Sequence, residues 1–114
     1  MVNNLLIVED HPAMRRLIRS LVEDLAMSVH ECEDGAQALA AYEEFLPEWI
    51  LMDIEMKEKD GLAATREITT AHPEAKIVIV TKNSTKRMRE EARLAGACEY
   101  ILKENLLAIR TLIH

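Results

Sequence analysis

The sequence is short of cysteine, glycine and proline. Its two cysteines, Cys32 and Cys98, form neither a Cys-x-x-Cys motif nor a cluster with histidine, so neither a zinc site nor a redox motif is supported. We expect two reduced thiols in or near the core. The three Gly and three Pro are spread along the 114 residues without a linker, a repeat or a low-complexity tract. This indicates a single domain over residues 1–114.

Long apolar runs and an excess of positive charge are also absent. The uninterrupted apolar stretches, such as Trp49 to Met52, are too short to span a bilayer, and the opening MVNNLL lacks the features of a signal peptide. A formal net charge of −6, with one Trp, two Tyr and one Phe, does not suit direct contact with nucleic acid. We therefore expect a cytoplasmic protein that contacts neither membrane nor nucleic acid.

Short apolar runs alternate with helix-length segments along the whole chain. Four runs rich in Ile, Val and Leu lack period-2 alternation, as strands buried on both faces do. These runs are Leu5–Val8, Trp49–Met52, Ile77–Val80 and Tyr100–Leu102. The stretch Met27–Cys32 does alternate between apolar and polar residues, which predicts an edge strand with one wetter face.

A segment with helical features follows each of these five runs. The first opens at Pro12 with an amphipathic stripe, and the others are Ala36–Phe45, Leu62–Ala71, Ser84–Ala95 and Glu104–Ile113. Five β-α units predict an α/β fold, a doubly wound parallel sheet with helices on both faces. The flavodoxin-like strand order 2-1-3-4-5 places the alternating second strand at an edge.

Polar residues follow four of the five predicted strands. Glu9 and Asp10 follow the first, Asp53 the third, Thr81 the fourth and Lys103 the fifth. Ligands of doubly wound sheets bind outside the carboxyl ends of the strands, where the strand order reverses. We therefore expect these side chains to meet in one crevice.

Together these residue types predict a site for forming an aspartyl phosphate. Three carboxylates that converge would raise one another's pKa, and a hard cation with few oxygen ligands and several waters, Mg²⁺, resolves the repulsion. Asp53 would attack phosphorus, while Mg²⁺, Lys103 and Thr81 stabilise charge on the transferred oxygens.

Each residue alone has an ordinary structural explanation. An acidic residue after a strand is more often a helix cap, Thr81 a strand-end cap and Lys103 a surface lysine. Asp60 is interpreted as the start of a turn with Gly61. His11, directly after the acidic pair, has the chemistry of a metal ligand, but a role in the loop or the helix start is the stronger interpretation. The functional prediction depends on the joint placement.

Five stretches of sequence add a family resemblance to this pattern. They are LLIVEDHPAMRRLI at 5–18, EDGAQAL at 33–39, ILMDIEMKEKDG at 50–61, IVIVTKN at 77–83 and AGACEYILK at 95–103. Over essentially its whole length the chain resembles the receiver domain of two-component response regulators. The motifs EDHP and ILKEN are most similar to the subgroup joined to helix-turn-helix output domains.

The resemblance implies a phosphorelay role for the predicted site. A histidine kinase, a phosphotransfer protein or a small donor such as acetyl phosphate would supply the phosphoryl group to Asp53. Glu9, Asp10 and Asp53 would hold Mg²⁺ with the backbone carbonyl of Glu55. The chain would not be an enzyme toward other substrates, because it would catalyse only its own phosphorylation and dephosphorylation.

The resemblance also implies a conformational output. Thr81 and Lys103 would contact the phosphoryl group, and Tyr100 would be an aromatic switch that turns inward when Thr81 is drawn toward the phosphate. The surface of the fourth helix, fifth strand and fifth helix would then change. Family members often form homodimers through the fourth and fifth helices.

Three residues depart from the family pattern. Lys57 stands where Pro is usual, and Lys82 follows Thr81 where small residues are common, so Lys82 would crowd the phosphate entrance or pair with Glu55. Glu104 stands where many members have Pro behind a cis peptide bond. A cis bond before a non-proline residue costs about 2.5–4 kcal/mol, so we expect the bond before Glu104 to be trans.

Two other functions use the same residues. A phosphatase with an Asp nucleophile usually has a second Asp two residues later, where this chain has Glu55, and carries a cap domain. An interaction module would bind Mg²⁺ in the acidic pocket without phosphotransfer.

Overall fold

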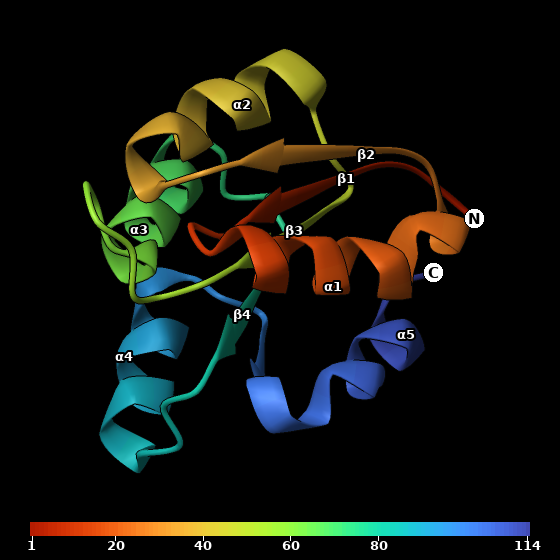
Figure 1. The fold of residues 1–114 in the computed structure, drawn as a ribbon. Helices are drawn as coiled ribbons and strands as arrows, with labels where there is room; N and C mark the ends of the chain where they lie inside the picture. Colours follow the sequence, from red (N-terminus) through yellow and green to blue (C-terminus); the bar gives the residue numbers. More distant parts are fainter.

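Five parallel strands form one sheet in the computed structural model, which describes all 114 residues (Figure 1). They are β1 (Val2–Val8), β2 (Ala26–Cys32), β3 (Trp49–Met52), β4 (Ile77–Thr81) and β5 (Glu99–Leu102). Their order is β2-β1-β3-β4-β5, so the predicted flavodoxin-like fold is confirmed. The stretch that alternates in sequence lies in the edge strand β2, as predicted, but its burial does not follow the alternation, because Met27 is 73% exposed and Ser28 and Glu31 are exposed as well.

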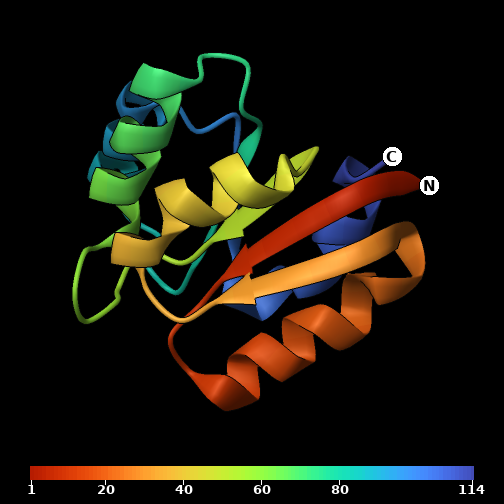
Figure 2. The ribbon, with the colours of Figure 1, turned by 90° about the horizontal axis from the view of Figure 1, so that it is seen from above.

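Helices cover both faces of the sheet (Figure 2). They are α1 (Pro12–Val22), α2 (Ala38–Phe45), α3 (Gly61–Ala71), α4 (Lys86–Ala95) and α5 (Ile109–Leu112), with 3₁₀ turns η1 (Glu23–Leu25), η2 (Gly35–Gln37) and η3 (Lys103–Ala108). Helices α2, α3 and α4 pack on one face, and α1 and α5 on the other. None of these helices has the length and apolar character needed to cross a membrane.

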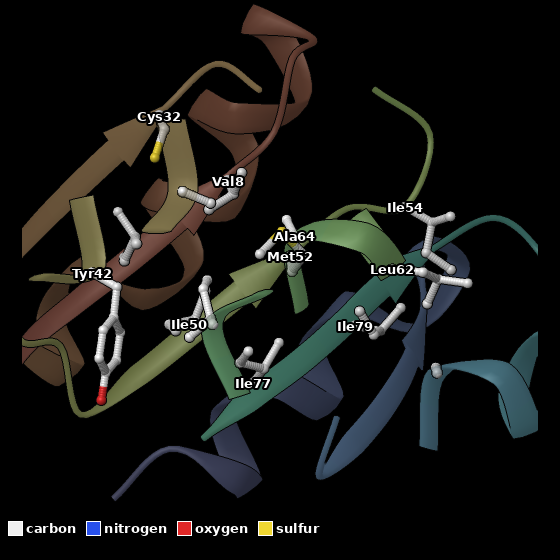
Figure 3. Close-up of a cluster of buried hydrophobic side chains, with 14 residues drawn as sticks. Val8, Cys32, Tyr42, Ile50, Met52, Ile54, Leu62, Ala64, Ile77 and Ile79 are labelled. Carbon is white, nitrogen blue, oxygen red and sulfur yellow. The ribbon is translucent and has the colours of Figure 1, made fainter. Parts of the chain in front are cut away.

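The core consists of two apolar clusters separated by the sheet. Successive side chains of a strand point to opposite faces, so β1 contributes to both clusters. Leu6 and Val8 belong to the cluster under α2, α3 and α4 (Figure 3), whereas Leu5 and Ile7 belong to the cluster under α1 and α5. All four side chains are fully buried, which explains why this run lacks alternation.

The helix ends follow local sequence signals. Pro12 is the first residue of α1, and Gly96 ends α4 with a φ of 108°, as its sequence position predicts. Asp60 does more than begin a turn, because its carboxylate caps α3 by accepting from the Ala63 N–H at 2.8 Å. Thr85 caps α4 in the same way, so α4 begins two residues later than predicted.

The last helix differs most from the prediction of one helix over residues 104–113. A 3₁₀ turn occupies Lys103–Ala108 and contains a non-helical residue, Asn105, at φ −130° and ψ 46°. Only Ile109–Leu112 are α-helical. Asparagine is a poor helix former because its side chain competes for backbone hydrogen bonds, which favours a break at this position. The peptide bond before Glu104 is trans, as expected.

Candidate functional site

The carboxyl ends of β1 and β3 place two carboxylates side by side. The Asp53 N–H donates to the Val8 carbonyl at 3.0 Å, and the Glu9 N–H donates to the Cys32 carbonyl at 3.1 Å. Both residues thus extend the hydrogen-bond ladder of the sheet by one step. Their side chains are directed by the sheet itself and not by a mobile loop.

Lys103 links these two carboxylates. Its Nζ lies 2.9 Å from Glu9 Oε1 and 3.3 Å from Asp53 Oδ1, and the exposed fractions of the Lys103, Glu9 and Asp53 side chains are 9%, 1% and 5%. No hydrogen bond of good geometry reaches Glu9 Oε1. One ammonium group therefore faces two buried carboxylates, which leaves an excess of negative charge.

This excess of negative charge helps to raise the pKa of Asp53. Burial, followed by the charge of Glu9, raises the pKa of Asp53 to about 7, although Lys103 and its hydrogen bond oppose the rise. Burial lowers the pKa of Lys103, but the two carboxylates outweigh it and hold that pKa above its usual value. A second positive charge in the site would favour the ionised form of Asp53.

The loop after β1 carries the third predicted carboxylate. Asp10, Glu9 and His11 offer ligand atoms that all lie within 4.8 Å of one another. His11 is the N-cap residue of α1, as the helix-start interpretation expects, and its N–H donates to Glu9 Oε2 at 3.2 Å. Its ring Nδ1 also lies 3.2 Å from Asp10 Oδ1, so the ring lies beside the carboxylates.

A pocket of about 250 Å³ opens beside Asp53. Its lining includes Lys103, Lys82, Glu55 and His11, together with two apolar residues of α1. Lys82 is on the wall of this pocket, consistent with the predicted crowding of the entrance, and it forms no salt bridge with Glu55. The pocket presents two ammonium groups to a small anion approaching Asp53.

Thr81 and Tyr100 both bond to the loop between β4 and α4. Thr81 is fully buried, and its Oγ1 accepts from the Asn83 N–H at 3.2 Å. The Tyr100 hydroxyl donates to the Asn83 carbonyl at 2.7 Å, and the Arg89 guanidinium lies 4.7 Å from the centre of the Tyr100 ring. The two residues of the predicted switch are therefore connected through Asn83.

Two contributors to the site were not found from the sequence. A Cβ atom on Gly61 would lie 1.8 Å from the Asp53 carbonyl oxygen, so only glycine permits this close approach. The turn signal at Asp60-Gly61 was the one feature of the sequence that pointed to a special backbone requirement at position 61. Arg15 donates from Nη1 to the Glu9 carbonyl at 2.8 Å, and nothing in the sequence distinguishes it from other polar residues of α1.

The comparison with protein families decides the identity of this arrangement. The family model described as the response regulator receiver domain matches residues 5–113. The chain belongs to this family. The resemblance seen in the sequence is therefore confirmed, and with it the assignment to two-component signal transduction.

Curated relatives of this receiver domain cover most of its length. It is 38% identical over 104 residues to chemotaxis protein CheY of Bacillus subtilis, covering 90% of this chain and 87% of that protein. It is 35% identical over 103 residues to CheY of Halobacterium salinarum, covering 90% of this chain and 86% of that protein. These relatives are themselves little longer than the matched region.

Solved structures give the same result. A two-component response regulator of the LuxR family from Aurantimonas sp. SI85-9A1 superposes with a TM-score of 0.89 at 29% identity, covering 99% of this chain and 86% of that chain. A DNA-binding response regulator of the LuxR family from Staphylococcus aureus has a TM-score of 0.88 at 27% identity, covering 98% of this chain and 96% of that chain. Both support the receiver assignment.

Proposed function

We propose that this receiver domain accepts a phosphoryl group on Asp53 in the presence of Mg²⁺. The observation that supports this most directly is the placement of Lys103 between the Asp53 and Glu9 carboxylates beside an open pocket. The predicted pair of a nucleophilic carboxylate and a cation for phosphoryl oxygens is thus within contact distance.

The residues present fit Mg²⁺ by their chemistry. Glu9 is buried with one oxygen lacking a well-aligned hydrogen-bond donor, and Asp10 lies in the same cluster. Asp53, which shares the Lys103 ammonium with Glu9, adds a further hard carboxylate. We assign these three carboxylates and the main-chain carbonyl of Glu55 as the residues that would hold the ion. When bound, Mg²⁺ would neutralise the negative charge that gathers between the carboxylates and the phosphoryl oxygens.

Three side chains of the domain would take part in the phosphoryl transfer itself. An Asp53 Oδ forms the new bond to phosphorus, while the bond from phosphorus to the donor's nitrogen or oxygen breaks and the donor leaves with its electron pair. The Lys103 ammonium contacts a phosphoryl oxygen, and the Thr81 hydroxyl turns toward another. The charge on the transferred group is thereby shared between groups at the carboxyl ends of β4 and β5.

The output would pass through Asn83. If Thr81 bonds to the phosphoryl group, its hydrogen bond with Asn83 changes, and so does the loop that holds the Tyr100 hydroxyl. The surface formed by α4, β5 and α5 is then altered for a partner. We infer that a histidine kinase or phosphotransfer protein is the phosphoryl donor. One response to phosphorylation would be a homodimer formed through α4 and α5. Residues 1–114 would act as a single domain throughout.

Intact-mass spectrometry after incubation with Mg²⁺ and acetyl phosphate tests the proposal. We expect a mass gain of one phosphoryl group that is lost in Asp53→Asn and in the absence of Mg²⁺. Absence of the gain, together with failure to bind beryllofluoride, would favour a Mg²⁺-binding interaction module. Turnover of external phosphomonoesters would instead favour a phosphatase and contradict a chain that acts only on itself.

A further inference from the structure

One arginine reaches from α1 to the loop that carries two of the three carboxylates. The Arg15 side chain is 15% exposed, and its guanidinium bonds at two points. Nη1 donates to the Glu9 main-chain carbonyl at 2.8 Å, and Nε donates to Glu31 Oε1 on the edge strand β2, also at 2.8 Å. The guanidinium therefore joins the acidic loop to the sheet.

The bonded carbonyl belongs to the peptide group between Glu9 and Asp10. A peptide group is planar, so a hydrogen bond that fixes the direction of its carbonyl also fixes the plane from which both neighbouring side chains leave. The Glu9 N–H is held on the other side by the Cys32 carbonyl at 3.1 Å. Arg15 is thus the side chain that sets the orientation of the peptide unit between the two carboxylates.

Glu31 keeps the guanidinium in place. Its Oε2 accepts from Arg19 Nη1 at 2.6 Å, while its Oε1 accepts from Arg15. The planar fork of arginine suits this two-point contact, which lysine cannot reproduce. Arg19 lies one helical turn further along α1 and shares Glu31, but the hydrogen bonds it makes do not reach the acidic loop.

We propose that Arg15 is a positioning residue for the cation site, and that it holds Glu9 and Asp10 in the arrangement that binds Mg²⁺. The proposal rests on the function proposed above, because it assigns these carboxylates as ligands. Outer residues that orient metal ligands typically change metal affinity by about 10–100-fold. A residue of this kind acts on affinity for the ion and not on the chemical step.

Calorimetric titration with Mg²⁺ tests this role in the full chain. We expect Arg15→Ala to weaken Mg²⁺ binding by about tenfold. The matched control Arg19→Ala removes a partner of the same glutamate and should change the affinity by no more than about twofold, as for a partly exposed ion pair. Arg15→Lys should fall between the two, because lysine keeps the charge but lacks the planar fork that holds both contacts in place.

A second readout separates positioning from general destabilisation. The rate of phosphorylation by acetyl phosphate, measured against Mg²⁺ concentration, should need more Mg²⁺ in Arg15→Ala but reach the wild-type rate at saturation. Equal weakening in Arg15→Ala and Arg19→Ala, or a lower saturated rate with unchanged affinity, would overturn the proposal. If Arg15→Ala does not fold, Arg15→Lys and Glu31→Gln carry the same test.

The two proposals fail separately. Wild-type chain that binds Mg²⁺ but gains no phosphoryl group would contradict phosphotransfer to Asp53, while a tenfold loss in Arg15→Ala would still support the positioning role. Wild-type chain that gains the phosphoryl group, with Mg²⁺ affinity unchanged in Arg15→Ala, would contradict the positioning role alone.

Discussion

Tyr100 and Thr81 bond to the two main-chain polar groups of one residue, Asn83. The Tyr100 hydroxyl donates to its carbonyl at 2.7 Å, and the Thr81 hydroxyl accepts from its N–H at 3.2 Å. A displacement of either side chain therefore acts on the same peptide backbone. This arrangement ties the β4–α4 loop to both residues of the predicted switch.

Removing the Tyr100 hydroxyl should cost stability without affecting phosphotransfer. Tyr100→Phe is expected to lower the free energy of unfolding by about 1 kcal/mol, the usual contribution of one such hydrogen bond. Urea unfolding measures this loss. Tyr42→Phe is the matched control, because the Tyr42 hydroxyl makes no hydrogen bond within the chain, and an equal loss in both variants would contradict the assignment.

The raised pKa of Asp53 predicts an unusual dependence of stability on pH. An unfolded aspartate ionises near pH 4, whereas the folded chain without Mg²⁺ keeps the Asp53 proton up to about pH 7. The folded state binds more protons in this window, so the contribution of Asp53 to stability falls as pH rises, by up to about 1.4 kcal/mol per pH unit, and levels off above pH ~7.

Asp53→Asn should remove this dependence. In EDTA at pH 8 we expect the variant to exceed the wild type in free energy of unfolding by ~2–4 kcal/mol, a difference that shrinks toward pH 4. Urea unfolding of both chains at several pH values checks this, and the difference isolates Asp53 from the other carboxylates. A wild type that is more stable than the variant at pH 8 would refute the raised pKa.

Gly61 should matter for both folding and phosphotransfer. In Gly61→Ala the added Cβ would meet the Asp53 carbonyl at 1.8 Å, so the backbone carrying the phosphoacceptor must move. We expect a loss of at least about 2 kcal/mol in stability and no phosphorylation of the folded protein.

A second glycine provides the comparison. In Gly96→Ala the Cβ would meet the Thr69 side chain at 2.6 Å in a backbone with φ 108°, far along the chain from Asp53. Stability should fall here too, but the folded fraction should still be phosphorylated in the mass assay. Equal phosphorylation of both variants would contradict a special role for Gly61.

Leu46 is a position where the native residue is unfavourable. It ends α2 with φ 48° and ψ 56°, a left-handed conformation suited to glycine, and its side chain is 66% exposed. Leu46→Gly should raise the free energy of unfolding by about 0.5–1 kcal/mol. Leu94, which is 69% exposed within α4, is the control. Leu94→Gly should lower the free energy of unfolding by about 1 kcal/mol, because glycine is a poor helix former. Stabilisation by both changes would disprove the conformational explanation.

The sequence was sufficient to predict the sheet and the residues at its carboxyl ends. Runs such as Leu5–Val8 are buried on both faces, so their composition alone distinguishes them from amphipathic segments. Glu9 and Asp53 follow such runs directly. Lys103 follows β5, an edge strand in which only Ile101 is buried, so the prediction of burial on both faces was wrong there. The parallel topology still brings the three side chains to one edge. These predictions depend only on local pattern and on general rules of sheet topology.

What the sequence could not provide depends on contacts between distant segments. Arg15 is one of several charged residues on the polar side of α1, and only the packing of α1 against β2 brings it to Glu31 and the Glu9 carbonyl. The break at Asn105 has a local cause instead, competition between the apolar stripe of the last segment and a residue of low helix propensity. Neither outcome is encoded in the spacing of apolar residues.

The two apolar clusters share the same central strands, which has a consequence for the folding reaction. If one helical layer opens, it exposes one face of strands whose other face the opposite layer still covers. Such partial unfolding would expose much apolar surface, while the chain would gain little conformational entropy because the strands stay ordered. We expect unfolding to be a single cooperative transition. Amide hydrogens of the interior strands β1 and β3 should then exchange with deuterium only when the whole molecule opens, and those of the edge strand β2 earlier.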